Sequence, residues 1–184
     1  MNQLFDLLQG QLSDDMIDQL SDKLGGVNRD QTAVASKSLI STLIGGIAQN
    51  ALQDRNKAES LNHALERDHD GSILEDVMGF LGGQREVQNR KMVDGEGIVN
   101  HVFQDQKRKS SVLDMVSRMS GMDTGKAGNL MSMLAPLVMG ALGKTKRQQG
   151  LDVGGLMSLL SNTQTEAQSG SNSLANSLIN SFLD

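Results

Sequence analysis

The chain has 184 residues, with four Phe, one Pro, no Trp, Tyr or Cys, and a formal net charge of −5 at pH 7. The lack of cysteine excludes a disulfide framework, a thiolate metal site and a cysteine nucleophile. Strands favour aromatic and β-branched residues, whereas the frequent Leu, Ala, Met and Gln favour helices, so the composition predicts an all-α protein. No basic segment followed by a long apolar run opens the sequence, and we expect a cytoplasmic protein.

The most apolar stretch of the sequence covers residues 130–143. A helix there has no polar face to turn toward water, so we expect it to be buried on all sides. Its length of about 14 residues is short of the roughly 20 that a membrane-spanning helix needs. The stretch therefore predicts a core helix and no membrane span.

An earlier segment, residues 35–48, matches this stretch when the numbering is shifted by 95. The shift pairs Leu39 with Leu134 and Gly45 with Gly140, and other apolar positions, glycines and caps along the chain keep the same register. We therefore predict an internally duplicated multi-helix bundle, in which two pseudo-symmetric five-helix copies surround two buried central helices.

The helices of the first copy are predicted from apolar spacing and end signals. Ser, Asn and Asp residues offer N-caps, and the Gly pairs 25–26 and 82–83 offer left-handed exits. In chain order, the expected helices are residues 2–10, a helix from the Ser13–Asp15 cap to Gly25, a long helix from Asn28 to near Asn50, Lys57–Arg67, and Ser72–Leu81.

The domain organisation follows from the same pattern. Residues 1–83 form the first copy, residues 84–95 a linker and residues 96–184 the second copy, and we expect the copies to be fused into one domain. The second copy includes a polar linker at 163–172 and an amphipathic helix at 173–184. This tail can dock on its own chain or on a neighbouring molecule, and effective concentration favours its own chain.

Small residues and one proline mark the two central helices. Gly45 and Gly140 lack side chains within the two most apolar segments. Either the two helices cross at these glycines, or the glycines merely mark helix ends. Pro136 is expected either to kink its helix or to form its first turn.

The nearest approach to a binding motif is Asp68-His69-Asp70-Gly71, because carboxylates at alternate positions followed by glycine are typical of the middle of a calcium loop. In that frame Glu66 holds the first position, but Val77 holds the twelfth, where a bidentate Glu belongs. The alternative is a polar turn that caps the flanking helices. Glu66, Asp68 and Asp70 are therefore only weak candidates for a metal site.

No other pattern predicts chemistry. His63, His69 and His101 fall on separate elements, and no serine lies in a nucleophile motif, so we expect no catalytic residue and no cofactor. Two basic clusters, Lys107–Lys109 and Lys144–Arg147, fall in expected loops of the second copy. No aromatic residues lie between them, and we expect no nucleic-acid binding.

Four strings of the sequence, Met1–Leu12, Ala64–Leu74, Gly97–Phe103 and Met133–Gly143, together resemble the YidB-like family of bacterial proteins, a domain of unknown function. The resemblance covers nearly the whole chain up to its polar tail. It implies an all-α cytoplasmic bacterial protein without an established activity, and it carries over no catalytic or binding residue.

These observations favour a non-enzymatic helical protein that takes part in protein–protein interaction or assembly, including self-association. Apolar helical surface is plentiful, whereas catalytic constellations are missing. The alternative function is a metal-responsive, calcium-type binding protein that uses the turn from Asp68 to Asp70.

Overall fold

A computed structural model describes residues 3–67, 69, 71–74 and 95–169 of the chain. This part contains helices and no strand, which confirms the all-α prediction for it. A further helical segment of the described chain, residues 95–102, precedes α7. The elements are α1 (Gln3–Gln11), α2 (Asp14–Lys23), α3 (Arg29–Gln53), α4 (Arg55–Arg67), the 3₁₀ turn η1 (Ser72–Leu74), α7 (Gln106–Ser120), α8 (Thr124–Gln149) and α9 (Val153–Ser169).

The two long helices, α3 and α8, begin with side-chain caps. Asn28 Oδ1 accepts hydrogen bonds of 2.8 and 3.4 Å from the amides two and three residues further on. Asp123 Oδ2 accepts the equivalent pair at 3.0 and 3.3 Å. Such caps satisfy backbone donors that have no partner within the helix.

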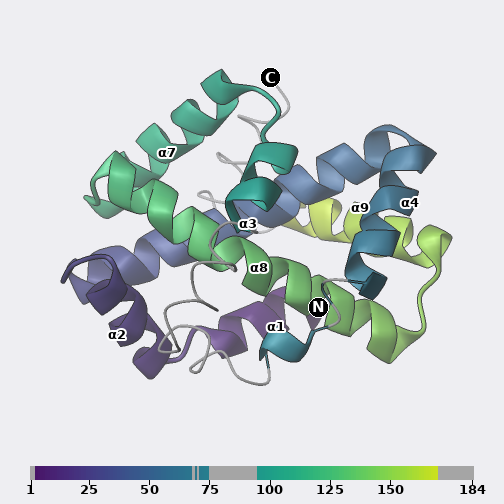
Figure 1. Cartoon of the computed structure of the whole chain (residues 1–184), viewed down its shortest axis with the longest axis horizontal. Coiled ribbons are helices and arrows are strands. Elements are labelled where there is room, and N and C mark those ends of the chain that lie inside the picture. Colours follow the sequence, from purple (N-terminus) through teal and green to yellow (C-terminus); the bar gives the residue numbers. More distant parts are fainter. Residues whose placement is uncertain (1–2, 68, 70, 75–94, 170–184) are drawn as a thin grey trace.

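The helices α3 and α8 lie against each other and cross at the centre of the molecule (Figure 1). Both are buried along most of their length, and one hydrophobic cluster joins residues from both halves of the chain. Helix α1 packs on α8, while α7 and α9 pack on α3. Each long helix is therefore covered by elements from the other half of the chain.

Two glycines of α8 allow the segment that follows α4 to pack closely against this helix. A Cβ atom on Gly143 would overlap the carbonyl oxygen of His69, and one on Gly140 would lie 2.5 Å from Ile73 Cγ2. The closest neighbour of Gly140 is thus the η1 turn, so the prediction that this glycine mediates a close crossing with α3 is wrong.

Pro136 lies inside α8, which continues on both sides of it and excludes the expected first-turn position. Proline has no N–H, so it leaves the carbonyl of Ser132, four residues earlier, without its helical donor. Gly95 packs at this point, because a Cβ on it would overlap that carbonyl oxygen and would lie 3.1 Å from Pro136 Cδ. Pro136 therefore lies at a close contact between α8 and the start of the 95–102 segment.

Two predicted boundaries are wrong. Gly95, expected in a linker, is helical, and residues 163–169, expected in a polar linker, continue α9. The buried Thr163 explains the second error, because its hydroxyl donates to the Leu159 carbonyl at 2.7 Å and so needs no water. Residues 75–81 and 84–94 and the tail at 173–184 lie outside the described residues.

Candidate functional site

A groove of about 970 Å³ lies between α3, α4 and the 95–102 segment. We call it the α3–α4 groove. Its α4 wall consists of Lys57, Ser60, Leu61, Ala64 and Arg67. The spacing of three, four, seven and ten residues from Lys57 places them along one helix face, and ten residues of helix span about 15 Å. The groove therefore runs along most of α4.

The other walls are mainly apolar. Ile47 and Ala51 of α3 face Ile98 and Val102 of the 95–102 segment, and Met139 of α8 also lines the space. The partly buried groove residues pack on the main hydrophobic cluster from outside. The groove thus exposes the edge of the protein core.

The α3 and 95–102 walls are held together across the groove. The side-chain amide of Asn50 donates to the His101 carbonyl at 3.4 Å. Gly97, which is exposed on the 95–102 wall, would meet no atom within 4 Å if it carried a Cβ. A side chain at this position would therefore have room to extend into the opening.

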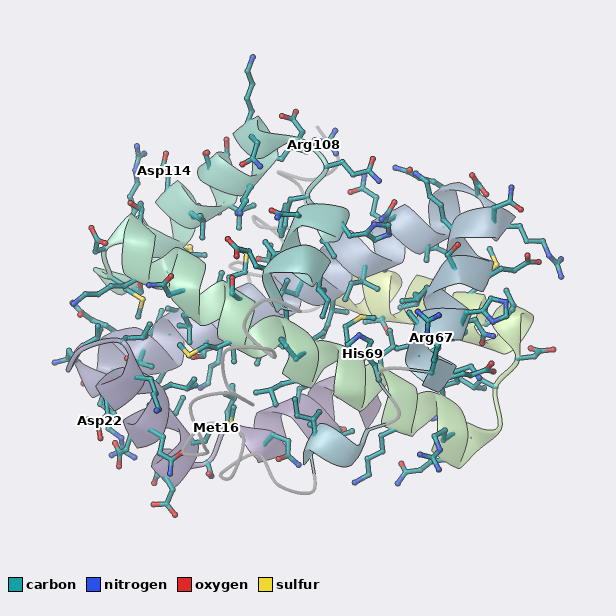
Figure 2. All side chains as sticks on the ribbon, viewed as in Figure 1. Met16, Asp22, Arg67, His69, Arg108 and Asp114 are labelled. Carbon is teal, nitrogen blue, oxygen red and sulfur yellow. The ribbon has the colours of Figure 1, made fainter. Side chains whose placement is uncertain are left out.

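The ionisable side chains of the described lining are all basic: Lys57 and Arg67, which are charged at pH 7, and the imidazoles of His69 and His101. Lys57 Nζ donates to the neutral amide oxygen of Gln53 at 2.7 Å. Arg67 and His69 lie close together at the C-terminal end of α4, next to α8 (Figure 2). Since Lys57 lies ten residues before Arg67, positive charge stands at both ends of the groove.

A smaller hollow of about 300 Å³ adjoins the groove and shares Asn50 and Val102 with it. Its other lining residues are mostly polar, and Asp105 and Arg108 bring one charge of each sign. The amide of Lys107 donates to Asp105 Oδ1 at 2.9 Å, so this carboxylate caps α7. The hollow is therefore a polar extension of an apolar, basic groove.

Of the three weak metal candidates, Glu66 is described, whereas Asp68 and Asp70 lie outside the described residues. Lys146 Nζ, on a side chain that is 9% exposed, lies 2.7 Å from Glu66 Oε1. The amide of Asn62 also donates to this oxygen, at 3.3 Å. The hydrogen bond and the charge of Lys146 hold the pKa of Glu66 below its ordinary value.

Glu66 thus joins α4 to α8 through an ion pair, which is a structural use of its carboxylate. In the part of the chain that the structure describes, no group of three or more His, Asp or Glu residues is placed to hold a metal ion. The calcium hypothesis still depends on Asp68 and Asp70, and it stays a prediction.

The histidines separate into two groups. His69 and His101, which lie on different elements, both line the groove, whereas His63 is exposed on α4 and does not. Sequence reasoning did not pair the first two, because they come together only when the 95–102 segment packs beside α3. The periodic stripe from Lys57 to Arg67 was the signal that could have indicated one wall of the groove.

The basic clusters are not in loops, contrary to the prediction. Lys107–Lys109 lie in the first turn of α7, and Lys144–Arg147 lie near the end of α8. Lys146 is buried and paired with Glu66. That side chain is therefore engaged within the protein, and the cluster does not present all its charges at the surface.

A comparison with protein families matches residues 6–145 to the family described as "Bacterial protein of unknown function (DUF937)". This range includes all the described residues that line the α3–α4 groove. No curated protein and no solved structure shows a significant match. Among the helices described by the structure, none combines the length and the apolar character needed to cross a membrane.

Proposed function

We propose that this chain, which belongs to the DUF937 family of bacterial proteins of unknown function, is a non-enzymatic cytoplasmic protein that binds another protein through the α3–α4 groove. The observation that carries the proposal is the groove itself. It offers an apolar surface between helices and a length of about three helical turns. Such a groove suits a helix of a partner protein, which would bury its apolar face there.

The polar groups of the groove support binding rather than catalysis. The hydroxyl of Ser60 donates to the Asn56 carbonyl at 2.9 Å, so its proton is committed to the backbone and not to a base. A nucleophilic serine needs a base within hydrogen-bond reach. The basic residues surround an apolar surface, an arrangement that orients a bound partner.

The internal duplication is part of the proposal. The first residue of α8, Thr124, follows that of α3, Arg29, by the predicted 95 residues, and both helices start after equivalent caps. Contacts repeat as well, because α2 packs on α3 as α7 packs on α8. Likewise, α1 packs on α8, while Asn50 of α3 bonds to the 95–102 segment. These repeats support two copies fused into one domain.

Site-specific cross-linking in the producing cell tests the binding function. The chain has no cysteine, so Ser60→Cys and Ser158→Cys each provide one site for a photoreactive label. Both are exposed helical serines whose hydroxyls donate to the carbonyl four residues earlier. We expect a cross-linked protein at position 60, inside the groove, and none at the control position 158.

Filling the groove provides the second arm of this test. Gly97→Leu extends a side chain into the opening, and Gly10→Leu makes the same change at an exposed helical glycine of α1 that also has no neighbour within 4 Å. The first substitution should abolish the cross-link and the second should leave it intact. Equal products at positions 60 and 158, or none at either, would contradict the proposed function.

A further inference from the structure

We propose that residues 173–184, the tail, dock on α3 at Gly45 in the way that the η1 turn docks on α8 at Gly140. The tail lies outside the described residues, and both the surface and the contact that it would copy lie within them. The proposal rests on the internal duplication proposed above. It does not depend on binding in the α3–α4 groove, which Gly45 does not line.

The contact between η1 and α8 is the described half of this comparison. A Cβ on Gly143 would overlap the carbonyl oxygen of His69, and one on Gly140 would lie 2.5 Å from Ile73 Cγ2. Leu74, the last residue of η1, is buried in the hydrophobic cluster. Two glycines three positions apart on α8 therefore make room for a segment that brings apolar side chains to the core.

Helix α3 has small residues at the equivalent places. The positions 95 residues before Gly140 and Gly143 hold Gly45 and Ala48, and both are buried. Residues three apart lie on one face of a helix. The polar hollow of about 300 Å³ lies next to this face, because the following residue, Gly46, lines it. The surface of α3 thus retains the feature that lets η1 approach α8.

The tail has the sequence pattern of the segment that docks on α8. Ser173–Ala175 follows Ser72–Leu74 by 101 residues, and Leu178 and Phe182 continue the apolar pattern at a spacing of four. The shift exceeds 95 because α9 has 17 residues where α4 has 13, and its last residue comes 102 positions after that of α4. The longer helix therefore accounts for the change of register.

The position of α9 favours docking within one molecule. Helix α9 packs on α3 and runs from the edge of the molecule toward its centre (Figure 1). Leu156, Leu160 and Thr163 are buried, so α9 follows the core along much of its length. Leu174 comes five residues after Ser169, and five residues span at most about 17 Å. This short connection gives the tail a high effective concentration at α3 of its own chain.

Paired cysteines in the full chain test the docking directly, because the natural sequence has no cysteine. A disulfide needs Cβ atoms about 4 Å apart. We expect an intramolecular disulfide in the test pair and in a positive control at the described contact, but none in a negative control on the exposed side of α1. In that order, the pairs are Leu174→Cys with Gly45→Cys, Ile73→Cys with Gly140→Cys, and Leu174→Cys with Gly10→Cys.

A second comparison leaves α3 unchanged, so it decides the question even if Gly45→Cys does not fold. In the helix that the sequence predicts for the tail, Leu178 and Phe182 lie on one side and Asn176 and Asn180 on the opposite side. Replacing the apolar pair by Asp should lower Tm by at least about 5 °C, because buried unpaired carboxylates are unfavourable. Replacing the two asparagines by Asp adds the same charge and should leave Tm unchanged.

Three results would overturn the inference. One is a test pair that stays reduced while the positive control forms its disulfide. Another is a covalent dimer of the test pair, because the tail would then dock on a second copy. The last is equal melting of the two Asp variants. The cross-link at position 60 still decides the binding function in each case, and the caps at Asn28 and Asp123 test the duplication separately.

Discussion

The hairpins α3–α4 and α8–α9 have similar frameworks and different surfaces. Both begin with a capped long helix that is buried at the centre, followed by a shorter helix. Leu65 of α4 and Leu160 of α9, which are 95 residues apart, are both buried. These two leucines, at equivalent places in the two hairpins, both belong to the core.

The rim of the groove is where the two hairpins differ. The positions 95 residues after Lys57 and Arg67 hold Asp152 and Asn162. Asp152 Oδ1 accepts from the Gly155 amide at 2.8 Å and so works as a helix cap. Leu156 is fully buried, whereas Leu61, at the equivalent position of the first hairpin, lines the groove. The binding that we propose therefore depends on surface positions of the first hairpin that its counterpart does not share.

Separating the two halves of the chain is expected to have the largest effect on thermal stability. Residues 1–83 and 96–184, produced alone, should show no cooperative thermal transition, because the central helix of each is covered by helices of the other. Mixing or co-producing them should restore one transition in circular dichroism. A cooperative melt of either half alone would mean that the hairpins are independent domains.

Gly143→Ala should have the next largest effect, from a single added methyl group. Its Cβ would overlap the His69 carbonyl, and a backbone group gives way less readily than a side chain. We expect a loss of about 3 kcal/mol, which lowers Tm by on the order of 10 °C. The position 95 residues earlier is Ala48, which α3 accommodates in the core.

The control for this substitution is Gly10→Ala, where a Cβ meets nothing within 4 Å. Alanine in an exposed helix position is better than glycine by roughly 0.5–1 kcal/mol, so this variant should melt at the same or a higher temperature. If Gly143→Ala melts like Gly10→Ala, the close approach of α8 to the segment after α4 is wrong.

The two helix caps test whether the hairpins are equivalent. Asn28→Ala and Asp123→Ala should each lower the free energy of unfolding by about 1 kcal/mol, because each cap satisfies two backbone amides. Chemical denaturation measures this loss. Asn129→Ala, an exposed position inside α8, should cost nothing. A large cost at one cap and none at the other would show that the equivalence does not extend to helix ends.

The smallest effect is expected at the ion pair between Glu66 and Lys146. Because the folded-state pKa of Glu66 is lowered, its contribution is present above its ordinary pKa of 4.5 and is lost as pH falls through the lower folded value. Glu66→Gln should therefore melt slightly earlier than wild type at pH 7, and the difference in Tm should close as the pH falls below 4.5. A gap that stays constant from pH 7 to 3 would mean that the pair does not stabilise the fold.

The sequence predicted those parts of the fold that local chemistry determines. The caps at Ser13, Asn28 and Asp123 and the stop at Gly25–Gly26 lie where the pattern placed them. The helical extension past Thr163 was missed, since a polar composition does not reveal that one hydroxyl is buried against its own helix. Local signals therefore predict helix starts better than the ends of polar helices.

The candidate site could not be predicted in the same way. Its walls come from α3, α4 and the 95–102 segment, and their arrangement depends on long-range packing such as the contact of Gly95 with α8. The motif that the sequence did indicate, around Asp68 and Asp70, lies largely outside the described residues. Spacing within α4 indicated one wall, but no local pattern indicates which wall faces it.

Methyl NMR of isoleucine and methionine during titration with an amphipathic helical peptide of about 14 residues tests the central proposal, that the α3–α4 groove is the binding surface. Ile47, Ile98 and Met139 line the groove, whereas Ile17 lies in α2 and Met157 in α9. The account predicts that the first three signals shift in a saturable way while Ile17 and Met157 stay in place. Shifts centred on Met157, or saturation without movement of Ile47 and Ile98, would contradict it.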